Sequence, residues 1–121
     1  MTEEKKTLVT VIMSDSPPVR IAEEDWPVLV NVWYTEGDGK CPANTTKSWR
    51  LVARKHADGR YLIYGVYLST SPNTYNYHAG ELVANPSGSE LITVIRRVAA
   101  ESSCGRLLDD FLVSLPPVDL V

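Results

Sequence analysis

Apolar and β-branched residues recur in three stretches of the chain, and this pattern predicts β-strands. Residues 7–13 (TLVTVIM), residues 28–35 (VLVNVWYT) and most of residues 47–68 are rich in the side chains that favour strands. Both faces of a strand over residues 28–35 would be largely apolar. We therefore expect a β-sheet with residues 28–35 at its centre. We also expect a helical turn over residues 22–26 and a further short strand between residues 75 and 83.

The segment from Lys47 to Leu68 predicts a β-hairpin. Asp58-Gly59 stands between two strand-like runs, and glycine readily takes the positive φ that tight hairpin turns need. If these two residues form the whole turn, which we favour, a single apolar face carries Trp49, Leu51, Ala53, Lys55, Leu62, Tyr64, Val66 and Leu68. If Ala57-Asp58-Gly59 form a three-residue loop with a bulge at Gly59, the pairing shifts by one residue and the apolar side chains segregate less well.

The last third of the chain predicts two helices. Ser87 and Glu90 have the spacing of a capping box, in which both side chains bind free N–H groups at a helix start. Apolar residues then recur at helical spacing, and Gly105 is a residue at which the helix could stop. Residues 106–115 repeat the pattern before Pro116-Pro117 ends it.

Strands that precede helices are typical of the α+β class. We predict an antiparallel sheet of three to five strands around a central hairpin, covered by two C-terminal helices. The 121 residues, 44% of them apolar and 22% charged, fit one globular domain over residues 1–121. No run is long enough to span a membrane, and the N-terminus lacks the pattern of a signal peptide. We therefore expect a cytoplasmic protein with no membrane partner.

The net charge of −3 hides a strong segregation of charge along the chain. Residues 14–39 carry six acidic residues and one basic residue, whereas residues 40–60 carry six basic residues and one acidic residue. An acidic surface can imitate the charge spacing of a nucleic-acid backbone and bind a protein partner with a basic surface. A solvated turn, or neutralisation of the basic strands within the sheet, is the simpler alternative. The predicted partner-binding residues are Glu23, Glu24, Asp25, Trp26, Glu36 and Asp38.

An alternative surface lies on the hairpin. In the favoured register, arginines and tyrosines share the face opposite the core, and single-stranded nucleic acids bind through stacking on aromatic rings and contacts of cations with phosphate. The negative net charge argues against this partner, so a solvated face is the simpler explanation. The residues of this alternative nucleic-acid face are Arg50, Arg54, Tyr61 and Tyr67.

Cysteine and histidine chemistry is not favoured by the sequence. Cys41 with His56 or His78 could form a nucleophile and its base, but Cys41 precedes Pro42 in a loop and no nucleophile elbow is present. Cys41 and Cys104 fit no disulfide framework, and no pair among the cysteines and histidines has the spacing of metal ligands. We predict no catalytic residue, no metal and no cofactor.

Four short segments resemble a group of small bacterial proteins of unassigned function. They are Asp25-Trp26-Pro27, the run from Arg54 to Arg60 that leads into Tyr64-Gly65-Val66-Tyr67, Ile95-Arg96-Arg97-Val98 and Leu115-Pro116-Pro117. The resemblance covers most of the chain from Val19 onward. It implies a context rather than an activity, because small proteins of this kind are carried by plasmids and phages together with acidic inhibitors of host defence such as anti-CRISPR proteins.

We therefore expect a non-enzymatic protein that binds another macromolecule, with an inhibitor of a bacterial defence complex as its most specific form. The alternative is a small nucleic-acid-binding regulator that uses the Arg/Tyr face. A small hydrolase built around Cys41 is a third hypothesis.

Overall fold

The computed structural model describes residues 7–37, 46–70 and 76–116. Strands come first and helices last. The elements are β1 (Leu8–Val11), β2 (Val19–Ala22), β3 (Val28–Gly37), β4 (Thr46–Lys55), β5 (Arg60–Ser69), β6 (Tyr77–Ala84), α1 (Gly88–Glu101), the 3-10 helix η1 (Gly105–Leu107) and α2 (Leu108–Ser114).

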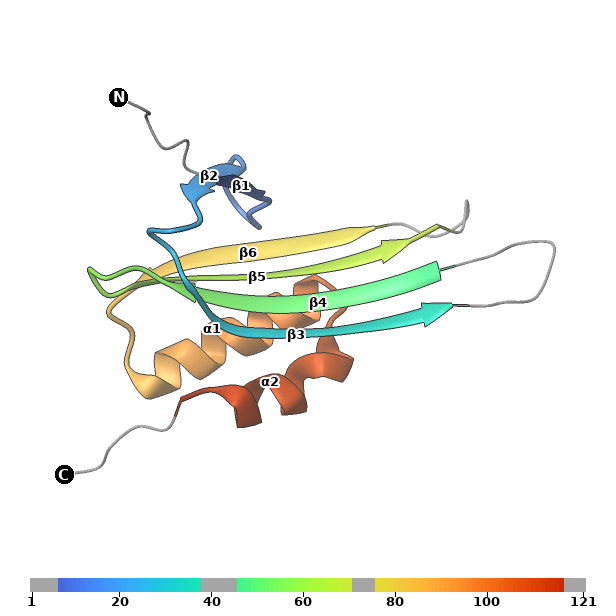
Figure 1. Cartoon of the computed structure of the whole chain (residues 1–121). Helices are drawn as coiled ribbons and strands as arrows, with labels where there is room; N and C mark the ends of the chain where they lie inside the picture. Colours follow the sequence, from blue (N-terminus) through green and yellow to red (C-terminus); the bar gives the residue numbers. More distant parts are fainter. Residues whose placement is uncertain (1–6, 38–45, 71–75, 117–121) are drawn as a thin grey trace.

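The four long strands form one antiparallel sheet in the order β3-β4-β5-β6, and β1 pairs with β2 in a separate hairpin (Figure 1). The predicted α+β class, with an antiparallel sheet and two C-terminal helices, is confirmed. Residues 22–26 form a hydrogen-bonded turn between β2 and β3, where the Asp25 N–H donates to the Ala22 carbonyl at 3.0 Å.

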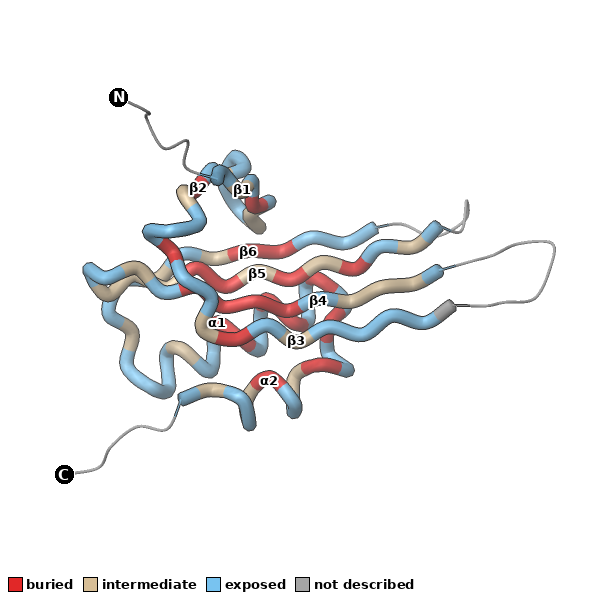
Figure 2. Tube along the Cα trace, in the orientation of Figure 1, coloured by how far each residue is buried: buried red, intermediate tan, exposed pale blue. Residues whose placement is uncertain are grey.

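The helices cover one face of the four-stranded sheet, and the β1–β2 hairpin covers part of the other (Figures 1 and 2). The helices pack on one face, which we call the helix face, and bury Leu51, Ala53 and Ile63 against Ile95 and Phe111. The β1–β2 hairpin packs on the other face, which we call the hairpin face. There the buried core cluster consists of Val11, Ile21, Trp26 and Leu62.

The β4–β5 hairpin has the shifted register, so the favoured two-residue turn was wrong. Ala53 pairs with Ile63, and the His56 N–H donates to the Arg60 carbonyl at 2.9 Å across a three-residue loop. Gly59 in this loop has φ +95°, a value that glycine adopts without strain. The shift brings Ala53 and Ile63, both fully buried, together on the helix face, so the better core packing decides the register.

Strand β3 lies at an edge of the sheet, which corrects the expectation of a central strand. It pairs with β4 on one side, and no second strand pairs with it among the described residues. The apolar residues on both faces of β3 therefore do not indicate that a strand pairs with each of its two edges. Val28, Trp33 and Tyr34 are 46%, 64% and 42% exposed.

The start of α1 agrees with the sequence-based prediction, whereas its end does not. The Glu90 N–H donates to the Ser87 hydroxyl at 3.2 Å, as the capping box predicts, and the Ser87 hydroxyl donates to the Glu90 carboxylate. Helix α1 ends at Glu101 rather than near Gly105, and Ser103 takes the left-handed conformation with φ +59°. Gly105 instead begins η1.

Candidate functional site

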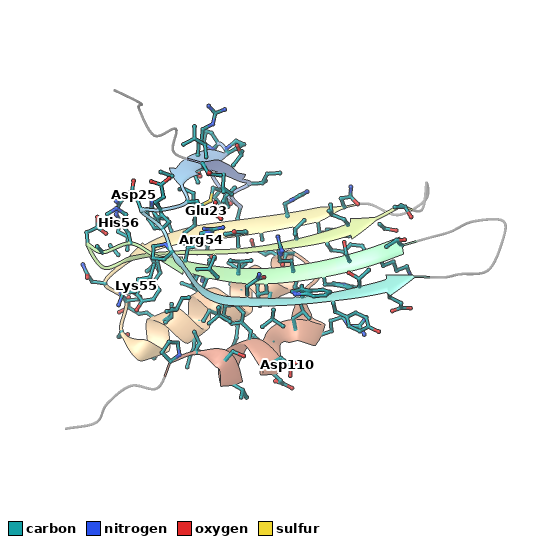
Figure 3. All side chains as sticks on the ribbon, in the orientation of Figure 1. Glu23, Asp25, Arg54, Lys55, His56 and Asp110 are labelled. Atoms are coloured by element: carbon teal, nitrogen blue, oxygen red, sulfur yellow. The ribbon has the colours of Figure 1, made fainter. Side chains whose placement is uncertain are left out.

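The acidic residues at the start of β3 form one exposed corner of the molecule. Glu23, Glu24 and Asp25 occupy the turn between β2 and β3, and all three are exposed. Figure 3 shows Asp25 close to His56 at the end of the sheet where the β4–β5 loop lies. Lys55 and His56 line a shallow hollow together with Glu24 and Asp25. Glu24 and Asp25 therefore lie near the Lys55 ammonium group and the His56 ring.

Trp26 is not part of the exposed surface, which corrects its prediction as an interface residue. Its side chain is 8% exposed and packs in the core of the hairpin face. Its carbonyl accepts a hydrogen bond from Arg54 Nη1 at 3.0 Å, and its ring lies 4.9 Å from the His56 ring and 4.9 Å from the Arg60 guanidinium carbon. Trp26 thus fixes the acidic turn to the sheet instead of offering an anchor to a partner.

The remaining predicted acidic residues do not join this corner. Glu36 lies near the opposite end of β3, eight residues beyond Val28, which corresponds to about 25 Å along an extended strand. Its carboxylate lies 3.5 Å from Arg106 Nη1. Asp38 lies outside the described residues. The six predicted residues therefore do not form a single patch.

The Arg/Tyr face predicted from the sequence does not exist as one surface. The shifted register places Arg50 and Arg54 on the hairpin face and Tyr61 and Tyr67 on the helix face. Arg54 is 7% exposed, and its Nε donates to the Tyr64 hydroxyl at 3.0 Å. A single strand of nucleic acid cannot contact both faces in the way that the prediction required.

The β4–β5 loop holds a local cluster of charged groups. Asp58 accepts hydrogen bonds from the Arg60 backbone N–H at 3.1 Å and from Arg60 Nε at 2.8 Å, and its other contact is with His56 Nδ1 at 3.0 Å. Desolvation raises the pKa of the Asp58 carboxyl, but the hydrogen bonds and charge of Arg60 outweigh it, so this pKa lies below its ordinary value. The cluster shapes the loop and holds its carboxylate ionised.

A row of aromatic rings crosses the helix face at the end of the sheet away from this loop. Each ring lies 5.2 to 6.1 Å from the next. The row consists of Tyr34, Trp49, Tyr67 and Tyr77. Arg106 of η1 covers part of it, with its guanidinium carbon 4.1 Å from the Tyr34 ring centre and 4.4 Å from that of Trp49. Sequence reasoning missed this row because it depends on the correct register.

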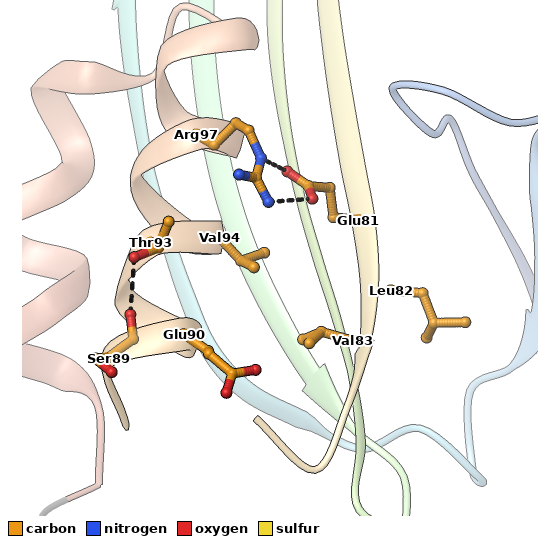
Figure 4. Close-up of a pocket in the computed structure, with 8 residues that line it drawn as sticks. All are labelled: Glu81, Leu82, Val83, Ser89, Glu90, Thr93, Val94 and Arg97. Atoms are coloured by element: carbon orange, nitrogen blue, oxygen red, sulfur yellow. Dashed lines mark hydrogen bonds and ion pairs between the residues drawn. The ribbon is translucent and has the colours of Figure 1, made fainter. Parts of the chain in front are cut away.

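A hollow between β6 and α1 contains a bidentate ion pair (Figure 4). Arg97 Nε and Nη2 donate to the two carboxylate oxygens of Glu81 at 2.5 and 2.7 Å. The hydrogen bonds and charge of Glu81 raise the pKa of the Arg97 guanidinium above its ordinary value. Because both oxygens of Glu81 accept from Arg97, this carboxylate is engaged as a structural partner rather than as an acid or base.

The cysteine and histidine candidates are dispersed. Cys104 is fully buried, and its thiol lies 3.4 Å from the Arg50 carbonyl and 3.3 Å from the Val66 carbonyl. His78 is exposed on β6, and Cys41 lies outside the described residues. Within the described ranges, no group of three or more His, Cys, Asp or Glu side chains has the geometry to hold a metal ion. None of the helices in those ranges has the length and apolarity that crossing a membrane requires.

The outer edges of β3 and β6 differ in whether another described segment of the chain forms hydrogen bonds with them. At β6, the Ser14 N–H donates to the Gly80 carbonyl at 2.9 Å and the Gly80 N–H donates to the Ser14 hydroxyl at 3.1 Å, so this edge is partly occupied by the chain itself. Beside β3, the described part of the chain provides no such segment.

Comparison of the chain with known protein families, curated proteins and solved structures finds no match.

Proposed function

We propose that this chain is a non-enzymatic binding protein whose partner is another protein, held along the outer edge of β3. The observation that carries the proposal is the position of an apolar strand at the edge of the sheet. Strand edges bind extended segments of other chains through backbone hydrogen bonds, and natural proteins usually protect long edges with charges, prolines or covering segments.

Strand β3 has little such protection along its middle. No charged residue and no proline occurs between Val28 and Thr35. Its bulge lies at the beginning, between Val28 and Val30, and leaves the strand regular from Val30 to Gly37. Trp33, at 64% exposure, projects from this regular part. Tryptophan is enriched at protein interfaces relative to the rest of the protein surface, which supports a protein partner at this edge.

The sequence-based alternatives receive less support from the geometry. The arginines and tyrosines of the nucleic-acid hypothesis lie on opposite faces of the sheet. The hydrolase hypothesis rests on Cys41, which lies outside the described residues. An inhibitor of a bacterial defence complex is one form of a protein-binding protein, and the proposal includes it as the most specific form suggested by the resemblance.

The test compares two exposed apolar residues changed to the same charged side chain. Trp33→Lys places a charge on the β3 edge, whereas Val113→Lys places one on α2, where Val113 is 85% exposed. Each variant and the wild-type protein would be immobilised and exposed to bacterial lysate, and captured proteins would be quantified by mass spectrometry. We expect at least one protein to be captured by the wild type and by Val113→Lys, and to be depleted about tenfold with Trp33→Lys.

Thermal melts of the same samples establish that both variants are folded. Equal capture by folded Trp33→Lys and by the wild type would contradict binding at β3. A salt-sensitive shift of labelled single-stranded DNA or RNA, with no protein captured, would instead favour a nucleic-acid partner.

A further inference from the structure

We infer that the partner segment held by β3 is an extended strand flanked by lysine or arginine residues, with its basic end at the acidic corner of Glu23, Glu24 and Asp25. This inference rests on the proposed function and specifies the chemistry of the partner. Three observations carry it: the backbone groups that face outward, the side chains beside them and the charges at the strand ends.

The pairing of the sheet determines which backbone groups of β3 face outward. In antiparallel sheets, successive residues direct their N–H and C=O groups alternately to the two sides of the strand. Gly80 of β6 bonds outward to Ser14, so its pairing partner Tyr64 directs its groups towards β4. Tyr64 pairs with Val52, whose groups therefore face β5 and not β3.

The same alternation determines which backbone groups of β3 face away from β4. Val52 pairs with Asn31, so Asn31 directs its N–H and C=O away from β4, and Trp33 and Thr35 follow at intervals of two. These three residues present three donors and three acceptors along a stretch of about 14 Å. A strand of five or more residues matches this row, whereas a helix or a compact loop does not.

The side chains beside the row favour apolar residues in the middle of the partner strand. Val32 and Tyr34 lie on the helix face of β3, and Trp33 lies on the hairpin face. Trp33 and Tyr34 are 64% and 42% exposed. A strand added beside them would cover part of both rings with its alternating side chains, which is favourable for apolar and β-branched residues.

The charges along the edge favour basic residues in the flanks of that strand. The three exposed carboxylates of the corner precede β3, and Glu36 lies near its far end with a side chain that is 55% exposed. Arg106 already faces Glu36, and Lys47 is paired opposite it in β4, so the far end is partly neutralised. The turn before β3 carries three carboxylates, whereas Lys55 and Arg54 are the cations beside it and the charge of Arg60 is balanced by Asp58. The corner is therefore the more acidic end.

A second copy of this chain is a less suitable occupant. Its β3 would bring no basic residue to the edge, and its own turn and Glu36 would add further carboxylates. Opposite charge on the partner both favours the encounter and discriminates against acidic strands. The structure therefore favours a different protein, with a basic strand.

The experiment uses three synthetic peptides with the same alternating valine and threonine core of seven residues. The first carries two lysines at each end, and the second carries two glutamates at each end. The third is the lysine peptide with an N-methyl group on every core residue, so that neither edge of the strand can donate. Binding of each fluorescein-labelled peptide to the full chain would be measured by anisotropy at two salt concentrations.

We expect the lysine peptide to bind about tenfold more tightly than the glutamate peptide at low salt, with the difference shrinking as salt rises. The N-methylated peptide should bind weakly because it lacks backbone donors. Trp33→Lys should weaken binding of the lysine peptide, Val113→Lys should not, and Glu23→Lys/Glu24→Lys/Asp25→Lys should abolish the preference for lysine.

Equal binding of the lysine and glutamate peptides would overturn the basic-strand inference, as would undiminished binding of the N-methylated peptide. Sedimentation showing a dimer that Trp33→Lys dissociates would overturn it in favour of a second copy. Absence of peptide binding would also overturn it, and the proposed function would still stand if lysate capture depends on Trp33. The two proposals therefore fail in different measurements.

Discussion

Ser103 holds a backbone conformation that an L-amino acid rarely adopts. It follows α1 with φ +59°, while the Cys104 N–H donates to the Ala99 carbonyl at 2.7 Å and the Ser103 N–H to the Ala100 carbonyl at 3.3 Å. These bonds form the motif that commonly ends helices, in which the left-handed position is usually glycine. Here the position is filled by serine, so part of the stability available to this helix end is unused.

Ser103→Gly should raise the free energy of unfolding by about 1 kcal/mol, because glycine enters the left-handed region without the steric cost. Urea denaturation would measure the change. The control is Glu101→Gly, in the last turn of α1, which should lower stability by about 1 kcal/mol. A loss of stability in Ser103→Gly would show that the serine side chain matters more than its backbone.

Asp58 should make a pH-dependent contribution to stability. Its pKa is lowered in the folded protein by Arg60, so the contribution is present above the ordinary aspartate pKa and is lost as pH falls through the folded value. The difference in unfolding free energy between the wild type and Asp58→Asn should therefore be larger at pH 7 than at pH 3. Urea denaturation at both values would measure it, and a difference independent of pH would contradict the role of this carboxylate.

At the scale of the elements, Arg106 helps to attach η1 to the sheet, beside the buried Leu107. Its guanidinium lies over Tyr34 and Trp49 and near Glu36, so one side chain joins η1 to β3 and β4. The side chain is 44% exposed, which keeps the expected energy small.

Arg106→Met should lower the free energy of unfolding by about 0.5 to 1 kcal/mol, because it removes the cation from both rings while retaining much of the aliphatic chain. It should also change tryptophan fluorescence, since Trp49 loses its cover. Arg96→Met, on the exposed side of α1, is the control and should change neither property. Equal effects of the two variants would contradict a stabilising contact of Arg106 with the two rings.

The sequence predicted which strands and helices exist better than it predicted their register and their positions in the sheet. Enrichment in apolar and β-branched residues identified the long strands β3, β4 and β5, and Ser87 with Glu90 identified the start of α1. The hairpin register was missed because Asp58-Gly59 fits both a two-residue turn and the end of a three-residue loop, and only packing against α1 and α2 distinguishes them.

Edge position and burial of single residues were beyond the sequence for a related reason. A strand such as β3 can have the same apolar sequence pattern whether the strand beside its outer edge belongs to the same chain or to a partner protein. Trp26 directly follows three acidic residues, so its local sequence suggested exposure, whereas its neighbours in space include Leu62 and Ile21. Local pattern fixes which side chains alternate, but contacts between distant segments decide what covers them.

At the scale of the whole molecule, the sheet is a middle layer between the helices and the β1–β2 hairpin. Gly80 is where the hairpin layer approaches most closely: an added Cβ would lie 2.7 Å from the Ile12 carbonyl oxygen and 3.0 Å from Met13 Sδ. The hydrogen bonds between Gly80 and Ser14 depend on this approach. The glycine therefore permits the contact between two layers.

Gly80→Val should displace the β1–β2 hairpin and lower the free energy of unfolding by about 1 to 3 kcal/mol, as overpacking does elsewhere. Hydrogen exchange should accelerate in β1 and β2 while α1 keeps its protection. The control is Gly88→Ala, where an added Cβ meets nothing within 4 Å and stability should not fall. Uniform acceleration across both layers would show that the hairpin layer and the helix layer unfold together.

The order β3-β4-β5-β6 has a consequence for the speed of folding. Every strand of this sheet pairs with the strand next to it in the sequence, so each pairing closes only a short loop of chain. Folding rates rise as contacting residues lie closer together in the sequence. The sheet can thus assemble one hairpin at a time, in the order in which a ribosome releases its strands, and β3 would present its free edge before either helix has been synthesised.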